Sequence, residues 1–232
     1  FQTGNAVDNT LYGYDAGTDI TSATRNTLVG SYAGDNITTG GKNVAIGNKA
    51  LTANTTGIEN VVIGDYAGSS ISTGSDNVGI GKDALGANTT ASSNVAIGKN
   101  ALKTVTTGAF NVAVGDGALK VSTGASNTAL GYRGLTANTT ADHNTAVGYL
   151  SLDADTTGGE NSAFGSWAAS GNTTGIRNTA IGFNAFYVNT TGSYNTAIGS
   201  KALDANTTAN YNTALGYDTL GVNTTGASNV AV

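Results

Sequence analysis

Residues 43–59 read NVAIGNKALTANTTGIE, and close copies of this phrase fill most of a chain of 232 residues. When the opening asparagine is numbered position 1, the copies share the consensus N-[TV]-A-[IVL]-G-x-x-A-L-x-x-N-T-T-G-x-x. Fourteen asparagines open such phrases, and twelve of the thirteen intervals between them are equal to that from Asn43 to Asn60; the interval from Asn111 to Asn127 is shorter by one. Such short and regular self-similarity indicates one structural unit stacked many times.

A unit of about 17 residues is too short for a pair of helices and suits one coil of a parallel β-solenoid, with two short strands and two turns. Positions 2 to 4 carry the β-prone residues, and positions 2 and 4 should share a face, as in Val44 with Ile46 and Thr179 with Ile181. The predicted fold class is therefore all-β. We expect a lead-in at residues 1–8 and one repeat domain at residues 9–232, with thirteen full coils and a truncated fourteenth.

Position 5 is glycine in every copy that reaches it, which predicts a positive φ or close contact with a neighbouring backbone. This structural turn is expected at Gly47, Gly64, Gly81, Gly98, Gly182 and Gly199. Position 15 also accepts alanine, as at Ala91, so a positive φ is not obligatory there. Positions 9 and 12 covary in eight coils, as though one apolar slot could be filled from either position. Position 12 is isoleucine where position 9 is Gly17, Gly34 or Gly68, and it is asparagine where position 9 is Leu51, Leu85, Leu135, Leu203 or Leu220.

The asparagine at position 1 should form a ladder in which amides hydrogen-bond from coil to coil, as should the hydroxyl pair at positions 13 and 14. The structural ladder is expected at Asn43, Asn60, Asn77, Asn94, Asn178 and Asn195. Positions 6, 7, 10, 11, 16 and 17 vary freely and are expected to face solvent. Specificity for a ligand would therefore lie at these variable positions. Each coil has few aliphatic groups, so association with other chains would help to bury them.

The formal net charge is −5 and the ten basic residues are scattered, which argues against a nucleic-acid or anionic-membrane surface. No apolar run is long enough to span a bilayer, and we expect no membrane insertion in this segment. The chain has no cysteine, so neither disulfides nor thiolate ligands can form. Cysteine-free repeats are common in extracellular fibres, and an extracellular, cell-surface or virion-fibre location is expected.

Residues suited to catalysis or metal binding are sparse and do not converge, so the chain is predicted not to be an enzyme and to need no cofactor or metal. The single histidine, His143, occupies variable position 17. Glu59 and Glu160 share that position but lie six coils apart, too far for paired acid–base chemistry. Asp153 and Asp155 could offer oxygens to Ca²⁺, but they match no calcium-binding loop.

Two further motifs are explained by the repeat. The GIGK run at residues 79–82 resembles a phosphate loop, but it is one copy of the strand phrase and no helix follows it. N-x-[ST] sequons recur at position 12, where the register predicts turn residues. The sequons begin at Asn54, Asn88, Asn138, Asn172, Asn189, Asn206 and Asn223.

The candidate binding residues are aromatic. Tyr132 and Tyr149 occupy position 6 of successive coils, Tyr194 and Tyr211 occupy position 17 of successive coils, and Trp167 is the only tryptophan. Exposed rings can bind the faces of sugars or another protein, and they can equally stack on one another or fill a subunit interface. A cell-surface glycan or a matrix protein is the corresponding partner.

The NVAIG and NTAIG phrases resemble the head repeats of YadA-type trimeric autotransporter adhesins. The resemblance implies a left-handed β-roll, three chains side by side in a homotrimer, and cell adhesion as the function. The longer unit, with ALxANTTGxxN between phrases, is also similar to tail-fibre repeats of phages and fibre repeats of marine bacteria that end in a self-cleaving chaperone. The adhesin repeat is shorter than the unit of this chain, so the coil cross-section and trimer contacts need not be the same.

The expected function is a non-enzymatic extracellular fibre segment, in which a stiff solenoid presents binding residues. Three alternatives stay open at this point. The first is the shaft of a phage or contractile-particle tail fibre, and the second is a self-assembling extracellular filament. The third is an ice-binding protein that uses the hydroxyl pairs, although the adjacent threonines do not form a flat T-x-T face.

Overall fold

The structure is a computed structural model that describes residues 6–232; the first five residues of the predicted lead-in lie outside this range. The chain is an all-β solenoid of about 13 turns of about 17 residues, and its strands are parallel, which confirms the predicted fold class. It divides into two compact units, Phe1–Asp116 and Gly117–Val232, called unit 1 and unit 2 below. No helix among residues 6–232 is long and apolar enough to cross a membrane.

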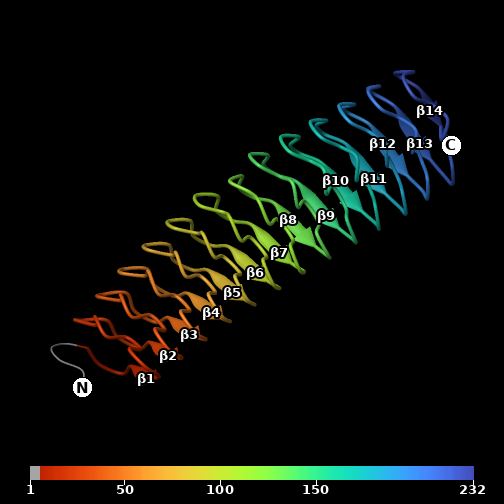
Figure 1. Cartoon of the computed structure of the whole chain (residues 1–232). Coiled ribbons are helices and arrows are strands. Elements are labelled where there is room, and N and C mark those ends of the chain that lie inside the picture. Colours follow the sequence, from red (N-terminus) through yellow and green to blue (C-terminus); the bar gives the residue numbers. More distant parts are fainter. Residues whose placement is uncertain (1–5) are drawn as a thin grey trace. The chain divides into compact units, whose positions relative to one another are not determined.

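Unit 1 contains seven short strands that lie side by side in chain order (Figure 1). They are β1 (Thr10–Tyr12), β2 (Thr27–Val29), β3 (Val44–Ile46), β4 (Val61–Ile63), β5 (Val78–Ile80), β6 (Val95–Ile97) and β7 (Val112–Val114). Each strand occupies positions 2 to 4, as predicted. Neighbouring strands pair with a register of one repeat, so that Val44 lies beside Val61 and Ile46 beside Ile63.

Unit 2 repeats this arrangement with seven further strands (Figure 1). They are β8 (Thr128–Leu130), β9 (Thr145–Val147), β10 (Ser162–Phe164), β11 (Thr179–Ile181), β12 (Thr196–Ile198), β13 (Thr213–Leu215) and β14 (Val230–Ala231). The register is again one repeat, with Thr179 beside Thr196 and Ile181 beside Ile198. Because the strands pair in this register, each position of the repeat forms a column along its unit.

The core of a coil is small. In the coil that begins at Asn43, the fully buried apolar side chains are those of Ala45, Ala50 and Leu51. The middle residue of each strand from β2 to β13 points inward, and the residues at positions 2 and 4 point outward together, as predicted from strand alternation. Except for the buried Val62 of β4, the β-branched side chains of these strands are on the outer face, while alanine usually faces the interior.

The prediction of two strands per coil is wrong, because each coil contains one. The reason is backbone handedness at positions 7 and 9, where non-glycine residues such as Lys49 (φ 54°) and Leu51 (φ 56°) adopt the left-handed conformation. Residues in this region cannot continue an extended strand. Position 17 is also left-handed in every described coil, with Glu59 at φ 60° as an example. The remainder of each coil is thus a succession of turns.

The short coil that begins at Asn111 lacks the residue of position 14. Thr123 donates its backbone N–H and its hydroxyl to the carbonyl oxygen of Thr139, the bonds that mark position 13 in other coils. Ser122 then replaces the asparagine of position 12, and its hydroxyl accepts the N–H of Gly124 at 3.2 Å. The same hydroxyl donates to Oδ1 of Asn138, the asparagine of position 12 in the next coil, at 3.5 Å.

Candidate binding surface

The asparagines of position 1 form hydrogen bonds inside the solenoid. Asn60 donates its backbone N–H to Oδ1 of Asn43 at 2.9 Å, and its Nδ2 donates to the same oxygen at 3.1 Å. The same Nδ2 also donates to the carbonyl oxygen of Gly74 at 2.9 Å. Both amides are fully buried. The six predicted ladder asparagines all make bonds of this kind within their units, so their polar atoms are occupied by the scaffold.

The six predicted turn glycines are also scaffold residues. Their φ angles lie between 129° and 139°, a region that side chains other than that of glycine rarely adopt. The space is closed as well: a Cβ on Gly64 would lie 2.6 Å from the carbonyl oxygen of Gly81 in the next coil. Position 5 therefore requires glycine for both its conformation and its close backbone contact.

The hydroxyls of position 13 contribute to a backbone contact between coils. The backbone N–H groups of Thr38, Thr39 and Gly40 and the hydroxyl of Thr38 all donate to the carbonyl oxygen of Thr55, at 3.0 to 3.2 Å. Successive N–H groups that converge in this way form a nest for an electronegative atom. In this contact the position 13 hydroxyls donate their hydrogen to a backbone carbonyl, so toward water they can act only as acceptors.

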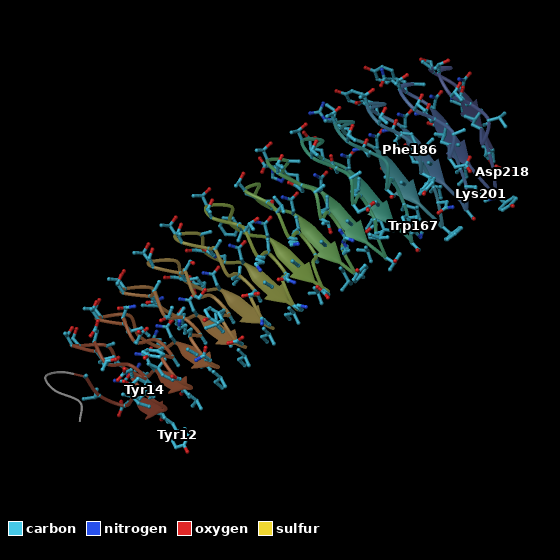
Figure 2. The ribbon with its side chains drawn as sticks, in the orientation of Figure 1. Tyr12, Tyr14, Trp167, Phe186, Lys201 and Asp218 are labelled. Atoms are coloured by element: carbon cyan, nitrogen blue, oxygen red, sulfur yellow. The ribbon has the colours of Figure 1, made fainter. Side chains whose placement is uncertain are left out.

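An aromatic row runs over four consecutive coils of unit 2. Tyr132 and Tyr149 stack with ring centroids 5.4 Å apart and planes 13° apart. Trp167 follows with its centroid 5.5 Å from Tyr149 and its plane turned by 66°. Tyr187 completes the row, 6.1 Å from Trp167 and at 80° to it. The three tyrosines are exposed and Trp167 is partly exposed; it lies at the rim of the ribbon in Figure 2.

Tyr187 was not predicted as a member of this row, because it occupies position 10 and its partner Trp167 occupies position 7. Sequence columns reveal contacts between equal positions in successive coils. A contact between different positions depends on where the backbone turns direct the two side chains. The signal present in the sequence was the run of aromatic residues Phe183, Phe186 and Tyr187, of which Phe186 is buried in the core.

The other two candidate tyrosines belong to a separate group, the position-17 cluster. Tyr194 and Tyr211 stack at 5.0 Å and 13°. Arg177 donates to the hydroxyl of Tyr194 at 3.0 Å, and its guanidinium lies 5.6 Å from the centre of that ring. Arg177 also forms a two-bond contact with Glu160, at 2.9 and 3.2 Å. The hydrogen bond from Arg177 lowers the pKa of the exposed Glu160 carboxyl.

Unit 1 uses two of its tyrosines differently. The ammonium group of Lys49 lies 5.9 Å from the ring centre of Tyr32 and 5.3 Å from that of Tyr66. These tyrosines occupy position 7 in the coils before and after that of Lys49. Cation–π contacts of this kind are worth roughly 0.5 to 1 kcal/mol at exposed sites. Both rings therefore already contact a cation of the same chain.

The outward residues of the strands form an aliphatic face on unit 1. It consists of the side chains at positions 2 and 4 of β3 to β7, which are all valine or isoleucine and are all at least partly exposed. They are Val44, Ile46, Val61, Ile63, Val78, Ile80, Val95, Ile97, Val112 and Val114. On unit 2 the position 2 column is threonine or serine from β8 to β13, so the corresponding face is more polar.

The remaining predictions concern charged residues. His143 is exposed, as expected for position 17. Asp153 accepts a hydrogen bond from the hydroxyl of Ser170 at 2.6 Å. Ser170 is buried, although its position, 10, was predicted to face solvent. Leu150 is a second buried residue at a position predicted to face solvent. Asp155 is fully buried, in a position where most coils have asparagine. Within residues 6–232 no three histidine, cysteine, aspartate or glutamate side chains group as metal ligands would.

The sequon asparagines are mostly buried. Asn88, Asn138, Asn172, Asn189 and Asn206 are all fully buried at position 12. The Nδ2 atom that would carry a glycan instead donates to the carbonyl oxygen of position 15, at 3.0 Å from Asn172 to Gly175. The register prediction that these residues are turn residues is confirmed for these coils.

Comparison of the chain with protein-family models, with curated proteins and with solved structures found no match.

Proposed function

We propose that the chain is a non-enzymatic structural segment of an extracellular fibre, in which solenoid units associate side by side with other copies of the chain and present binding residues on their outer surface. The observation that supports it most directly is the aliphatic face of unit 1. Ten valines and isoleucines lie in two columns on the outside of a sheet whose interior holds mainly alanine. Apolar surfaces of this extent on a soluble protein are typical of interaction sites.

A second copy of the chain is the partner that fits this face. The columns repeat at the spacing of parallel strands, about 4.8 Å, and another copy has columns with the same period. Side chains of one copy can therefore interdigitate with those of the other over several coils. The resemblance to trimeric adhesin repeats favours three copies, and the small core of each coil gives a physical reason for the association.

The bonds made by the repeat support a structural role for its invariant positions. Contacts between coils involve the asparagine of position 1, the glycine of position 5 and the hydroxyl of position 13. Asn60, Gly64 and Thr38 are examples. Most side chains that differ between coils lie on the surface. A fibre whose scaffold is constant and whose exposed positions vary can change its ligand without changing its fold.

The solution mass tests the association. The chain has a mass of 22.9 kDa, and sedimentation equilibrium should give three times this value. Replacing Ile63 and Ile80 with lysine should reduce the mass to that of a monomer with an unchanged circular dichroism spectrum, because both side chains point outward. Lysine at Thr56 and Thr73, which are exposed residues of position 14, is the matched control and should leave the trimer intact. A monomeric wild-type chain would refute the proposal.

A further inference from the structure

The aromatic row of unit 2 is not required by the fold. Position 6 of four consecutive coils in unit 1 holds Asp65, Lys82, Lys99 and Asp116. Each of these coils has a strand at positions 2 to 4, as the coils with aromatic residues do. The rings of the row are at least partly exposed, at positions that the scaffold leaves variable. Their contacts with one another stabilise the row, but the scaffold does not explain why aromatic residues occupy four consecutive coils.

The row is periodic. Successive ring centroids lie 5.4, 5.5 and 6.1 Å apart, so each coil contributes one ring to a track along the surface. The ring of Trp167 is held between two neighbours, because it contacts Tyr149 on one side and Tyr187 on the other. A ligand that binds here would lose little affinity to the ordering of these side chains.

The orientation of Trp167 differs from that of the tyrosines. Tyr132 and Tyr149 are nearly parallel and cover part of each other's faces. The indole is turned by 66° and 80° from its two neighbours, so neither tyrosine is stacked face to face on it. Trp167 is also partly exposed, and like Tyr187 it is not covered by parallel stacking on another ring of the row.

The surroundings of the row are polar without a net charge. At positions 6, 7 and 10 of its four coils the charged side chains are Arg133 and Asp153, one of each sign. Ser166 and Asn184, both partly exposed, add a hydroxyl and an amide at the same positions. Aromatic faces bordered by neutral hydrogen-bonding groups suit a ligand that is apolar on its faces and polar at its edges.

We propose that the aromatic row binds a linear, neutral, β-1,4-linked polysaccharide, with successive sugar rings following successive coils. Pyranose rings have apolar C–H faces and hydroxyl edges, and a β-1,4-linked chain is an extended ribbon whose advance per sugar ring is close to the spacing of the aromatic rings. An anionic polymer would need clustered basic residues, which these coils lack. The proposal rests on the extracellular fibre function, for which it names the class of ligand.

The single tryptophan makes the site directly observable, because all indole fluorescence comes from Trp167. The wild-type chain is titrated with cellohexaose and with chitohexaose while its emission is recorded. We expect a saturable change in emission and protection from quenching by acrylamide. Glucose should have no effect at the same sugar concentration, because one ring cannot contact several coils.

Two variants locate the site. Tyr149→Ala retains the fluorophore and should weaken binding about tenfold, which corresponds to about 1.4 kcal/mol. Phe110→Ala, which removes an exposed ring from unit 1, should bind as the wild type does. Tyr132→Ala serves as a second variant of the row should Tyr149→Ala lose its circular dichroism spectrum.

Several outcomes overturn the proposal: no saturable response to either hexasaccharide, binding by Tyr149→Ala and Tyr132→Ala as tight as that of the wild type, or emission that depends on protein concentration and not on sugar. The last result identifies the row as an interface between copies of the chain. The sedimentation mass of the same sample separates the two proposals. A trimer that does not respond to sugar refutes only the ligand, and a monomer that responds refutes only the association.

Discussion

The side chain of Ile71 fills the space beside Gly68, which lies one turn before it in the same coil. A Cβ on Gly68 would lie 3.0 Å from Cδ1 of Ile71, and Ile71 is fully buried. In the preceding coil the same region is filled from the other side of the bend by Leu51, and position 12 is Asn54. The covariation of positions 9 and 12 therefore reflects one apolar slot with two ways of filling it, as the sequence predicted.

This relationship predicts that the two fillings can be exchanged. Leu51→Gly alone should lower the free energy of unfolding by about 3 kcal/mol, because it leaves a leucine-sized cavity. Adding Asn54→Ile should restore stability to within about 1 kcal/mol of the wild type. Asn54 lies between coils that have Ile37 and Ile71 at its position, and its buried side-chain nitrogen and oxygen have no hydrogen-bond partner. Chemical denaturation of the two single variants and the double variant measures the coupling.

The matched control is the same exchange at Leu203 and Asn206. There Nδ2 of Asn206 donates to Oδ1 of Asn189 and to the carbonyl oxygen of Ala209, both at 3.2 Å. Isoleucine at 206 would remove these bonds, so the double variant should remain destabilised. Equal rescue at both sites would mean that the amide bonds of position 12 contribute nothing to stability.

The sequence predicted those features that each coil repeats with the same residue type. The strand at positions 2 to 4, the glycine turn and the slot of positions 9 and 12 all follow from columns of like residues. The left-handed residues at positions 7 and 17 were not predicted, because side chains as different as Lys49 and Trp167 occupy position 7, and Glu59 and Tyr194 occupy position 17. Their conformation is imposed by the hydrogen bonds between coils rather than by any preference of the residue itself.

In the candidate site, too, sequence columns predicted only the contacts between equal positions of successive coils. Tyr132 and Tyr149 share a position in successive coils, so their stacking could be anticipated. The contact of Trp167 with Tyr187 joins positions 7 and 10, and it depends on the turn that follows Gly182. Sequence columns carry no information on such diagonal contacts.

Glycine should be essential at position 5 but replaceable at position 15. Gly64→Ala places a side chain at φ 139°, and we expect a loss of about 2 kcal/mol or more. Gly74→Ala should cost less than about 1 kcal/mol, although its Cβ would also contact a carbonyl oxygen, that of Ala91. Ala91 itself occupies position 15, so the backbone adjusts to a methyl group there. Thermal unfolding compares the two variants; equal losses would show that space rather than φ restricts position 5.

The amide ladder should be sensitive to the loss of one member. Asn77 accepts the N–H of Asn94 at 3.0 Å and donates from Nδ2 to the carbonyl oxygen of Ala91 at 3.0 Å. Asn77→Ala leaves both buried groups without these bonds, and we expect a loss of about 3 kcal/mol. Asn48→Ala removes an exposed amide and should change the unfolding free energy by less than about 0.5 kcal/mol. A similar small effect at Asn77 would contradict a structural role for the ladder.

Asp155 should make the stability of the chain depend on pH. Its Oδ1 accepts the N–H of Gly158 at 2.9 Å, whereas its buried Oδ2 has no hydrogen-bond partner. Oδ2 corresponds to the Nδ2 of Asn172, which donates to the carbonyl oxygen of Gly175 in the same coil. A carboxylate cannot donate there but a protonated carboxyl can. Burial raises the pKa of the Asp155 carboxyl to about 8.

The sign of the effect follows from the proton bound in the folded state. The unfolded carboxyl ionises near pH 4, whereas the folded one retains its proton until about pH 8, so stability falls as the pH rises between these values. Asp155→Asn supplies a permanent donor. It should remove this dependence and raise the unfolding free energy at pH 7, by on the order of 3 kcal/mol. Denaturation at pH 4.5, 6 and 7.5 tests this, with the exposed Asp19→Asn as control. If Asp155→Asn follows the same pH profile as the wild type, the buried carboxyl is ionised in the folded chain and a different group must satisfy it.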